Sequence, residues 1–146
     1  MNHVIAQPTN TEACQAMFSL QPFLTPAIEE SHGELDLTDL FGMIHRGEAK
    51  VWLVFQEEPK KLVGVAVTEE TEYPHHSNLR VTFMGGCGML EWQDELDDAL
   101  CEYCEKHNLA NVEVVGRKGF VKTLAPLGYE PAYTVLLKTV KEVYCG

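Results

Sequence analysis

Cys87 is the residue whose surroundings could most directly make it reactive. It lies in the run Gly85-Gly86-Cys87-Gly88 at an expected helix start, where the positive end of the helix dipole lowers a thiol pKa. A nucleophilic thiol also needs a positioned base. The sequence identifies no such base, so Cys87 is not predicted to be a nucleophile.

Arg117 and Lys118 form a second chemical motif, because they lie between Gly116 and Gly119 at the start of another expected helix. Free backbone donors and paired cations at such a turn could hold a phosphate or a carboxylate. The alternative is a tight turn whose charges are solvated or paired with acidic groups. The sequence favours the turn and leaves binding open.

Cys101, Cys104 and His107 follow one another at intervals of three residues within a long expected helix. One helix could present them to zinc only with a further ligand, for which His75 and His76 are the evident source. A redox Cys-x-x-Cys normally opens a helix, whereas this one lies deep inside it. Buried cysteines are the commoner explanation, and no metal site is predicted.

The elements that must position these motifs fall into two groups. The first third of the chain predicts three helical pieces, which begin at Asn10 or Thr11, are interrupted by Pro22 and Pro26, and resume at the capping residue Asp36. The middle third predicts an antiparallel meander of three strands, at residues 50–55, 62–68 and 79–84.

A long helix follows the meander, because the apolar residues between Met89 and His107 step by three and four. A short strand at 112–115, a helix through Phe120 to Leu124 and a final strand at 129–140 complete the expected order. A long helix between neighbouring strands requires a parallel pair. The predicted fold is therefore α+β, with a mixed central sheet flanked by helices.

Length and composition limit the classes of function. The 146 residues suit one domain over 1–146, with a helical cluster at about 10–46 and the sheet with its helices at about 49–140. The formal net charge of -11 repels phosphate backbones and anionic lipid, so neither nucleic acid nor a membrane is an expected partner. The start of the chain lacks the pattern of a signal peptide, and we expect a cytoplasmic protein.

This order of elements resembles the GCN5-related N-acetyltransferase (GNAT) fold. The runs 47–53 and 116–120, Val63-Gly64 and Leu127-Gly128-Tyr129 are similar to small GNAT-like proteins encoded by tailed bacteriophages. The resemblance covers roughly residues 35 to 140.

The resemblance implies an acyl-CoA site at Gly85, Gly86, Cys87 and Gly88, aided by Arg117. Family members place a Gln or Arg two residues before this glycine loop, and their backbone N–H groups meet the pyrophosphate at the helix start. Phe83 occupies that position here. No lysine or arginine lies between Arg80 and Lys106, whereas seven carboxylates do.

The catalytic residues that the resemblance implies are also incomplete. Leu124 occupies the position of the family's tyrosine, which Tyr129 or Tyr133 could replace as the proton donor. Glu69 lies after the second meander strand, where related enzymes can keep a general base.

The sequence therefore favours a non-catalytic, phage-type protein, virion-associated or acting in assembly, with an eroded acyl-CoA site and no resident cofactor. Its expected partner is a phage structural protein or a host protein, in the host cytoplasm or the virion. The alternative is an acetyl-CoA-dependent N-acetyltransferase acting on an amine of a protein or small molecule. The sequence does not fix the oligomeric state.

Overall fold

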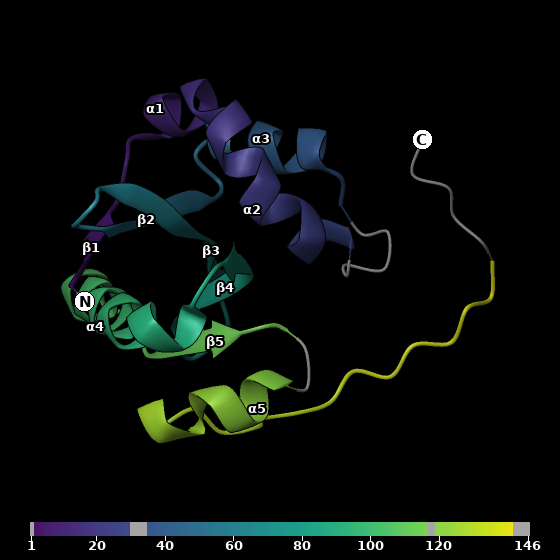
Figure 1. Cartoon of the computed structure of the whole chain (residues 1–146). Helices are drawn as coiled ribbons and strands as arrows, with labels where there is room; N and C mark the ends of the chain where they lie inside the picture. Colours follow the sequence, from purple (N-terminus) through teal and green to yellow (C-terminus); the bar gives the residue numbers. More distant parts are fainter. Residues whose placement is uncertain (1, 30–34, 117–118, 142–146) are drawn as a thin grey trace.

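The structure, a computed structural model, describes residues 2–29, 35–116 and 119–141. Its centre is one five-stranded sheet in the spatial order β1-β2-β3-β4-β5. Strands β1 to β4 pair with one another in antiparallel fashion, and β5 is parallel to β4 (Figure 1). The elements in chain order are β1 (His3–Ala6), α1 (Asn10–Gln15), α2 (Met17–Glu29), α3 (Leu37–His45), β2 (Lys50–Gln56), β3 (Lys61–Glu72), β4 (Ser77–Gly86), α4 (Met89–His107), β5 (Asn111–Val114), α5 (Gly119–Leu124) and a 3-10 turn, η1 (Ala125–Leu127). The α+β plan with a mixed sheet is confirmed.

Helices cover both faces of the sheet. The α1–α3 cluster lies over one face and α4 over the other (Figure 1). Two apolar cores result, because strand side chains alternate between the faces. Val65 and Val67 of β3 enter the core under α2 and α3, whereas Ala66 enters the core under α4.

Two predicted boundaries in the helical cluster were wrong. Thr9, not Asn10 or Thr11, caps α1, in a capping box with Glu12. α2 runs through Pro22 and Pro26 without interruption. Leu20, Leu24 and Ile28 recur every four residues along α2 and are buried, and this packing outweighs the lost backbone hydrogen bonds.

Other predictions of helix ends were right. Asp36 caps α3 in a capping box with Asp39. The long helix α4 spans Met89–His107, and Asn108 ends it in the left-handed conformation. No described helix is long and apolar enough to span a membrane.

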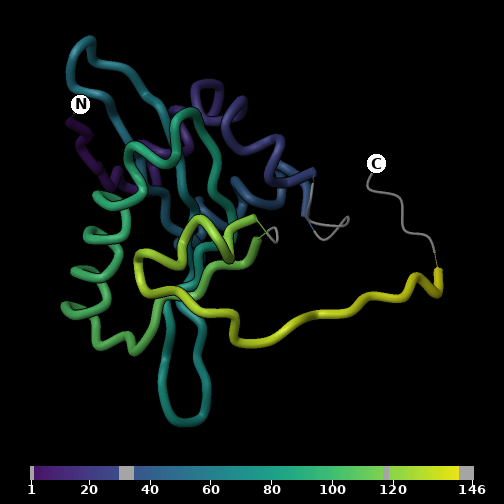
Figure 2. Tube along the Cα trace, turned by 60° about the horizontal axis from the view of Figure 1, so that its bottom comes forward, coloured from purple at the N-terminus to yellow at the C-terminus, as the bar shows by residue number. Residues whose placement is uncertain are grey.

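The edges of the sheet differ from prediction. β1, which the sequence did not indicate, pairs with β2. The expected final strand at 129–140 is absent from the sheet, and beyond Tyr129 the chain runs away from the body of the molecule (Figure 2). A strand exists only with a ladder partner, and in this structure residues 129–140 meet none.

Gly64 should be essential for the packing of α4 against the sheet. A methyl group at Gly64 would lie 2.7 Å from Cζ2 of Trp92, which is almost fully buried. Because a core tryptophan cannot move aside freely, Gly64→Ala should lower the free energy of unfolding by about 1–3 kcal/mol, measured by urea denaturation. Gly119→Ala is the matched control, since a methyl group there meets no atom within 4 Å and should leave stability nearly unchanged.

Candidate functional site

The sheet opens in the middle of β4. β4 pairs with β5 only from Asn78 to Val81, and the N–H of Val115 still donates to the carbonyl of Val81. Opposite β3, Val67 pairs with Phe83 and Thr68 with Val81, so Thr82 is an extra, bulged residue. Beyond Thr82, β4 is paired with β3 alone among the described residues. Such bulges often lie beside active sites, where they redirect a side chain.

A row of three charged side chains crosses the sheet just before this opening. Glu69 on β3 is the ladder partner of Arg80 on β4, and Arg80 is the ladder partner of Glu113 on β5. Arg80 and Glu113 form an ion pair of 3.0 Å. The row lies on the face of the sheet opposite α4. Leu79 and Val81, which flank Arg80 on β4, enter the core under α4, so Arg80 must point to the other face.

Glu113 is the most heavily bonded carboxylate of the row. Tyr73 Oη and Asn78 Nδ2 each donate to its Oε1 at 2.6 Å, and Arg80 Nε donates to its Oε2. Burial alone would raise the pKa of Glu113, but these three hydrogen bonds and the positive charge of Arg80 outweigh it and hold the pKa below its ordinary value. The hydrogen bond from Tyr73 to Glu113 also raises the pKa of the Tyr73 hydroxyl. Glu113 therefore stays ionised and anchors β5 to β4.

Glu69 is held differently. Thr82 Oγ1, on the bulge, donates to Glu69 Oε2 at 2.6 Å. Glu69 is only half-buried. Its carboxylate thus lies at the point where β4 and β5 part, with Oε1 as the atom that can accept a proton.

On the opposite face, a small cavity lies between β4, β5, α4 and η1. Its volume is about 20 Å³, room for about one water molecule. Most of its lining is apolar, and the polar side chains are Gln93, Asp97 and Tyr129. Oε1 of Gln93 is buried without a hydrogen-bond partner in the described part of the chain. This acceptor is available to an N–H donor.

Tyr129 closes this cavity. Its hydroxyl donates to Asp97 Oδ1 at 2.6 Å. Burial first, then this hydrogen bond and the charge of Asp97, raise the pKa of Tyr129 far above its ordinary value. The Tyr129 hydroxyl is therefore protonated and donates its proton in a hydrogen bond to Asp97. This hydrogen bond would have to break before Tyr129 could protonate another group.

The glycine turn that joins β4 to α4 is shaped mainly by close packing. A methyl group at Gly85 would collide with the carbonyl oxygen of Phe23 on α2, and one at Gly86 with that of Val63. The N–H of Cys87 already donates to the Val63 carbonyl at 2.9 Å. These glycines therefore let α2 and β3 approach β4 closely. This packing explains the two glycines without a bound ligand.

Gly88 is the part of the turn that could meet an anion. It begins α4 in the left-handed conformation, with φ of 65°, and provides no side-chain cap for the first turn. The nearest side chain is that of Glu91, whose Oε2 lies 3.3 Å from where a Gly88 methyl would stand. The backbone there suits a phosphate, whereas the local charge opposes one.

Other residues that the sequence singled out lie away from this turn or have no side chain that could bind an anion there. Phe83 is 6% exposed and belongs to the core under α2 and α3. Tyr133 is 70% exposed on the departing chain end. Cys87 is exposed. Arg117 and Lys118 lie outside the described residues.

The Cys101–His107 motif has no metal geometry in the described part of the chain, where no group of three or more His, Cys, Asp or Glu is placed to hold an ion. Cys101 is exposed near Asp97, Cys104 is buried, and the ring of His107 stacks on Tyr103. Burial raises the pKa of both thiols.

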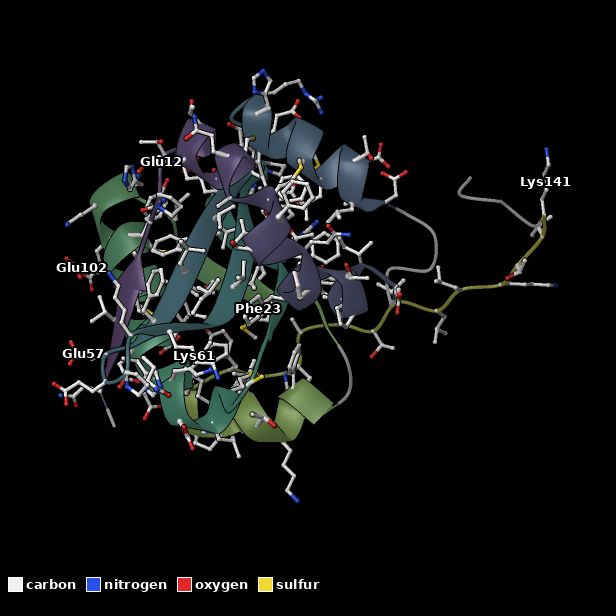
Figure 3. The ribbon with its side chains drawn as sticks, turned by 45° about the horizontal axis from the view of Figure 1, so that its top comes forward. Glu12, Phe23, Glu57, Lys61, Glu102 and Lys141 are labelled. Carbon is white, nitrogen blue, oxygen red and sulfur yellow. The ribbon has the colours of Figure 1, made fainter. Side chains whose placement is uncertain are left out.

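A larger hollow lies at the other end of α4. It has a volume of about 610 Å³ and is bounded by the β1–α1 connection, the start of β2 and the last turns of α4. Lys50 extends over the Tyr103 ring there, and Glu102 is paired with Lys106 at its rim, at the edge of the molecule in Figure 3. His107 of the Cys101–His107 motif lines this hollow, whereas the glycine turn, Glu69, Tyr129 and Tyr133 do not.

Sequence reasoning did not find Arg80, Glu113 or Asp97 as parts of a site. The signal was present for β4, where polar residues 78, 80 and 82 alternate with apolar 79, 81 and 83 and indicate one polar face. The meeting of Asn78 and Arg80 with Glu113 depends on strand pairing over more than thirty residues of chain.

Comparison with solved structures defines the fold. A predicted acetyltransferase from Clostridium acetobutylicum, solved with acetyl-CoA, matches with a TM-score of 0.63 at 12% identity, covering 95% of this chain and 97% of that one. The ribosomal-protein-alanine N-acetyltransferase of Brucella melitensis biovar Abortus gives 0.66 at 11% identity, with coverage of 97% and 100%. The fold is GNAT-like. An aminoglycoside acetyltransferase from an uncultured soil metagenomic sample, solved with sisomicin, gives 0.67 at 14%, with coverage of 95% and 97%.

No protein-family model matches the sequence, and a search of the curated proteins also found no match. At these identities the comparisons establish the fold of the chain, not its activity.

The ionised state of Glu113 should make stability depend on acidity. Since its folded pKa is depressed, its contribution is present above its ordinary pKa of about 4.3 and is lost as the pH falls through the lower folded value. Glu113→Gln should lower stability at neutral pH and lose less stability than the wild type on acidification. Urea midpoints at about pH 7 and about pH 3 measure this. Glu130→Gln, which removes an exposed carboxylate, is the control; parallel acid losses in all three proteins would contradict the role of Glu113.

Proposed function

We propose that this protein is an acyl-CoA-dependent N-acetyltransferase that modifies an amine of a protein or small molecule. The observation that carries the proposal is the position of Glu69. Thr82 holds this carboxylate on the bulge where β4 and β5 part, in a fold similar to that of acetyltransferases. A proton acceptor beside an opening in the sheet is the group that amine acetylation needs.

Glu69 acts as the general base in this proposal. Attack on an acyl group requires a neutral amine, so a proton must leave the ammonium form. Oε1 of Glu69 takes that proton, while Thr82 fixes the orientation of the carboxylate through Oε2. Arg80 lies directly opposite Glu69 on β4, and its Nε donates to Glu113 rather than to Glu69.

The residues that would hold acetyl-CoA are the turn at Gly88, the first N–H groups of α4 and Gln93. The uncapped helix start suits a pyrophosphate, and the unpartnered Oε1 of Gln93 suits an amide N–H of the cofactor arm. When bound, acetyl-CoA supplies an activated thioester acyl group.

Two features of the chain weaken this site. Glu91 places a carboxylate next to the helix start, and no described cation balances it at the turn. The cavity closed by Tyr129 holds about one water, so the Tyr129–Asp97 contact must open to admit a cofactor arm. Binding is therefore expected to be weaker than in a site with a basic loop.

The second candidate function is a non-catalytic protein-binding factor of phage type, acting in a virion or its assembly. The exposed face of α4 favours it, because five exposed carboxylates form one stripe along the helix: Glu91, Asp94, Asp98, Glu102 and Glu105. Such a stripe complements a basic surface on a phage structural or host protein. The phage origin and a place in the host cytoplasm or virion rest on the sequence resemblance.

Thermal melting with acetyl-CoA separates the two candidates. A ligand at about 1,000 times its Kd adds about 4 kcal/mol of stability, which for a chain of this size raises Tm by roughly 10 °C. We expect a clear increase in Tm with millimolar acetyl-CoA and none with the same concentration of sodium acetate. An unchanged Tm would remove the acetyltransferase proposal and leave the protein-binding one.

Glu69→Gln tests the base directly. Release of free thiol from acetyl-CoA in the presence of a panel of primary amines should fall by about 10²–10⁴-fold, with little change in acetyl-CoA affinity. Glu70→Gln removes the exposed neighbouring carboxylate and should keep full activity. Equal rates for Glu69→Gln and the wild type would refute the role of Glu69.

Glu91→Gln tests the charge at the helix start. Removing one like charge about 6 Å from a phosphate should tighten acetyl-CoA binding by about 1–3 kcal/mol, or roughly ten- to hundred-fold in Kd by calorimetry. Glu105→Gln, at the far end of α4, should change Kd little. If the two variants bind equally, the cofactor does not approach the Gly88 turn.

A further inference from the structure

The end of the described chain exposes apolar side chains that a stable surface would cover. The C-terminal segment, residues 131–140, contains Val135, Leu136, Leu137 and Val140, which are 65% to 91% exposed. Figure 3 shows Lys141, which follows the segment, far from the sheet and helices. Contiguous apolar exposure of this kind marks an interaction site.

The sequence of this segment is that of a strand. Tyr133-Thr134-Val135-Leu136-Leu137-Lys138 is rich in β-branched and aromatic residues. In an extended chain Tyr133, Val135 and Leu137 share one face, and Thr134, Leu136 and Lys138 the other. The segment has strand propensity and lacks a strand to pair with.

The sheet has a matching open edge. β5 is the last strand of the sheet and pairs only with β4 in the described part of the chain. Its outer backbone N–H and C=O groups can therefore accept another strand. Val112 and Val114 pack into the core under α4, so a strand added here would extend that core with one of its own faces.

We propose that the C-terminal segment of one copy of this chain adds to the outer edge of β5 in a second copy, reciprocally. The C-terminal segment extends away from the sheet and helices of its own molecule, including β5, in both views (Figures 1 and 2). Its start is fixed, since Tyr129 is bonded to Asp97 and Pro131 restricts the next turn.

A second copy is the partner because one chain carries both an unpaired strand and an unpaired edge. Exchange of identical segments between two copies satisfies both at once and closes with two-fold symmetry. The face with Tyr133, Val135 and Leu137 is more apolar than the face with Thr134 and Lys138, so in the proposed dimer it lies on the side of Val112 and Val114, next to the core under α4. The proposal does not rest on acyl-CoA binding.

The test is the mass of the full chain in solution, by sedimentation velocity and light scattering. The wild type should have twice the mass of one chain. Val135→Lys/Leu137→Lys places two charges on the core-facing side and should halve that mass. Ala132→Lys/Thr134→Lys adds the same charge on the other face and should remain a dimer. Circular dichroism checks that each variant is folded.

Amide hydrogen exchange identifies the pairing. In the wild-type dimer the amides of residues 133–138 should exchange slowly, and they should exchange fast in the Val135→Lys/Leu137→Lys monomer. A monomeric wild type overturns the proposal: slow exchange of 133–138 would then show pairing within one chain, and fast exchange an unpaired segment. A dimer that survives Val135→Lys/Leu137→Lys, or is lost equally in both double variants, overturns it as well.

Discussion

The change of partner along β4 is the constraint on which the rest of this structure depends. Up to Val81, β4 is bonded on both sides; from the bulge at Thr82 onward, the described part of the chain pairs it with β3 alone. The bulge places Thr82 against Glu69 on one face. On the other face, the separation of β4 and β5 makes the small cavity that Gln93 and Tyr129 line. Both parts of the candidate site thus arise from one irregularity in the ladder.

Packing and charge act on different parts of the glycine turn. Gly85 and Gly86 allow α2 and β3 to approach β4, so their lack of a side chain is explained by the fold. Gly88 and the uncapped start of α4 retain the backbone of an anion site, yet Glu91 lies beside them. A glycine pattern alone therefore does not distinguish a phosphate cradle from close backbone packing, and the local charge decides how tightly an anion binds.

Predictions from the sequence succeeded where the signal was local. The cap at Asp36, the span of α4 and the stop at Asn108 each follow from a few neighbouring residues. They failed where tertiary contacts prevail. α2 continues through Pro22 and Pro26 because its buried leucines outweigh the missing bonds. The strand expected at 129–140 has the right composition, but it has no neighbour in the described structure.

The amino-acid sequence by itself determined the α+β plan, the acidic character and the lack of lysine and arginine between Arg80 and Lys106, since these depend on composition and short-range patterns. Only the tertiary structure decided that Glu69 meets Thr82, that Arg80 and Asn78 meet Glu113, and that Tyr129 meets Asp97. These side-chain hydrogen bonds depend on strand register and on the positions at which β5 and η1 pack. Register is fixed by the burial of whole faces of the sheet, a property of the assembled chain and not of any single segment.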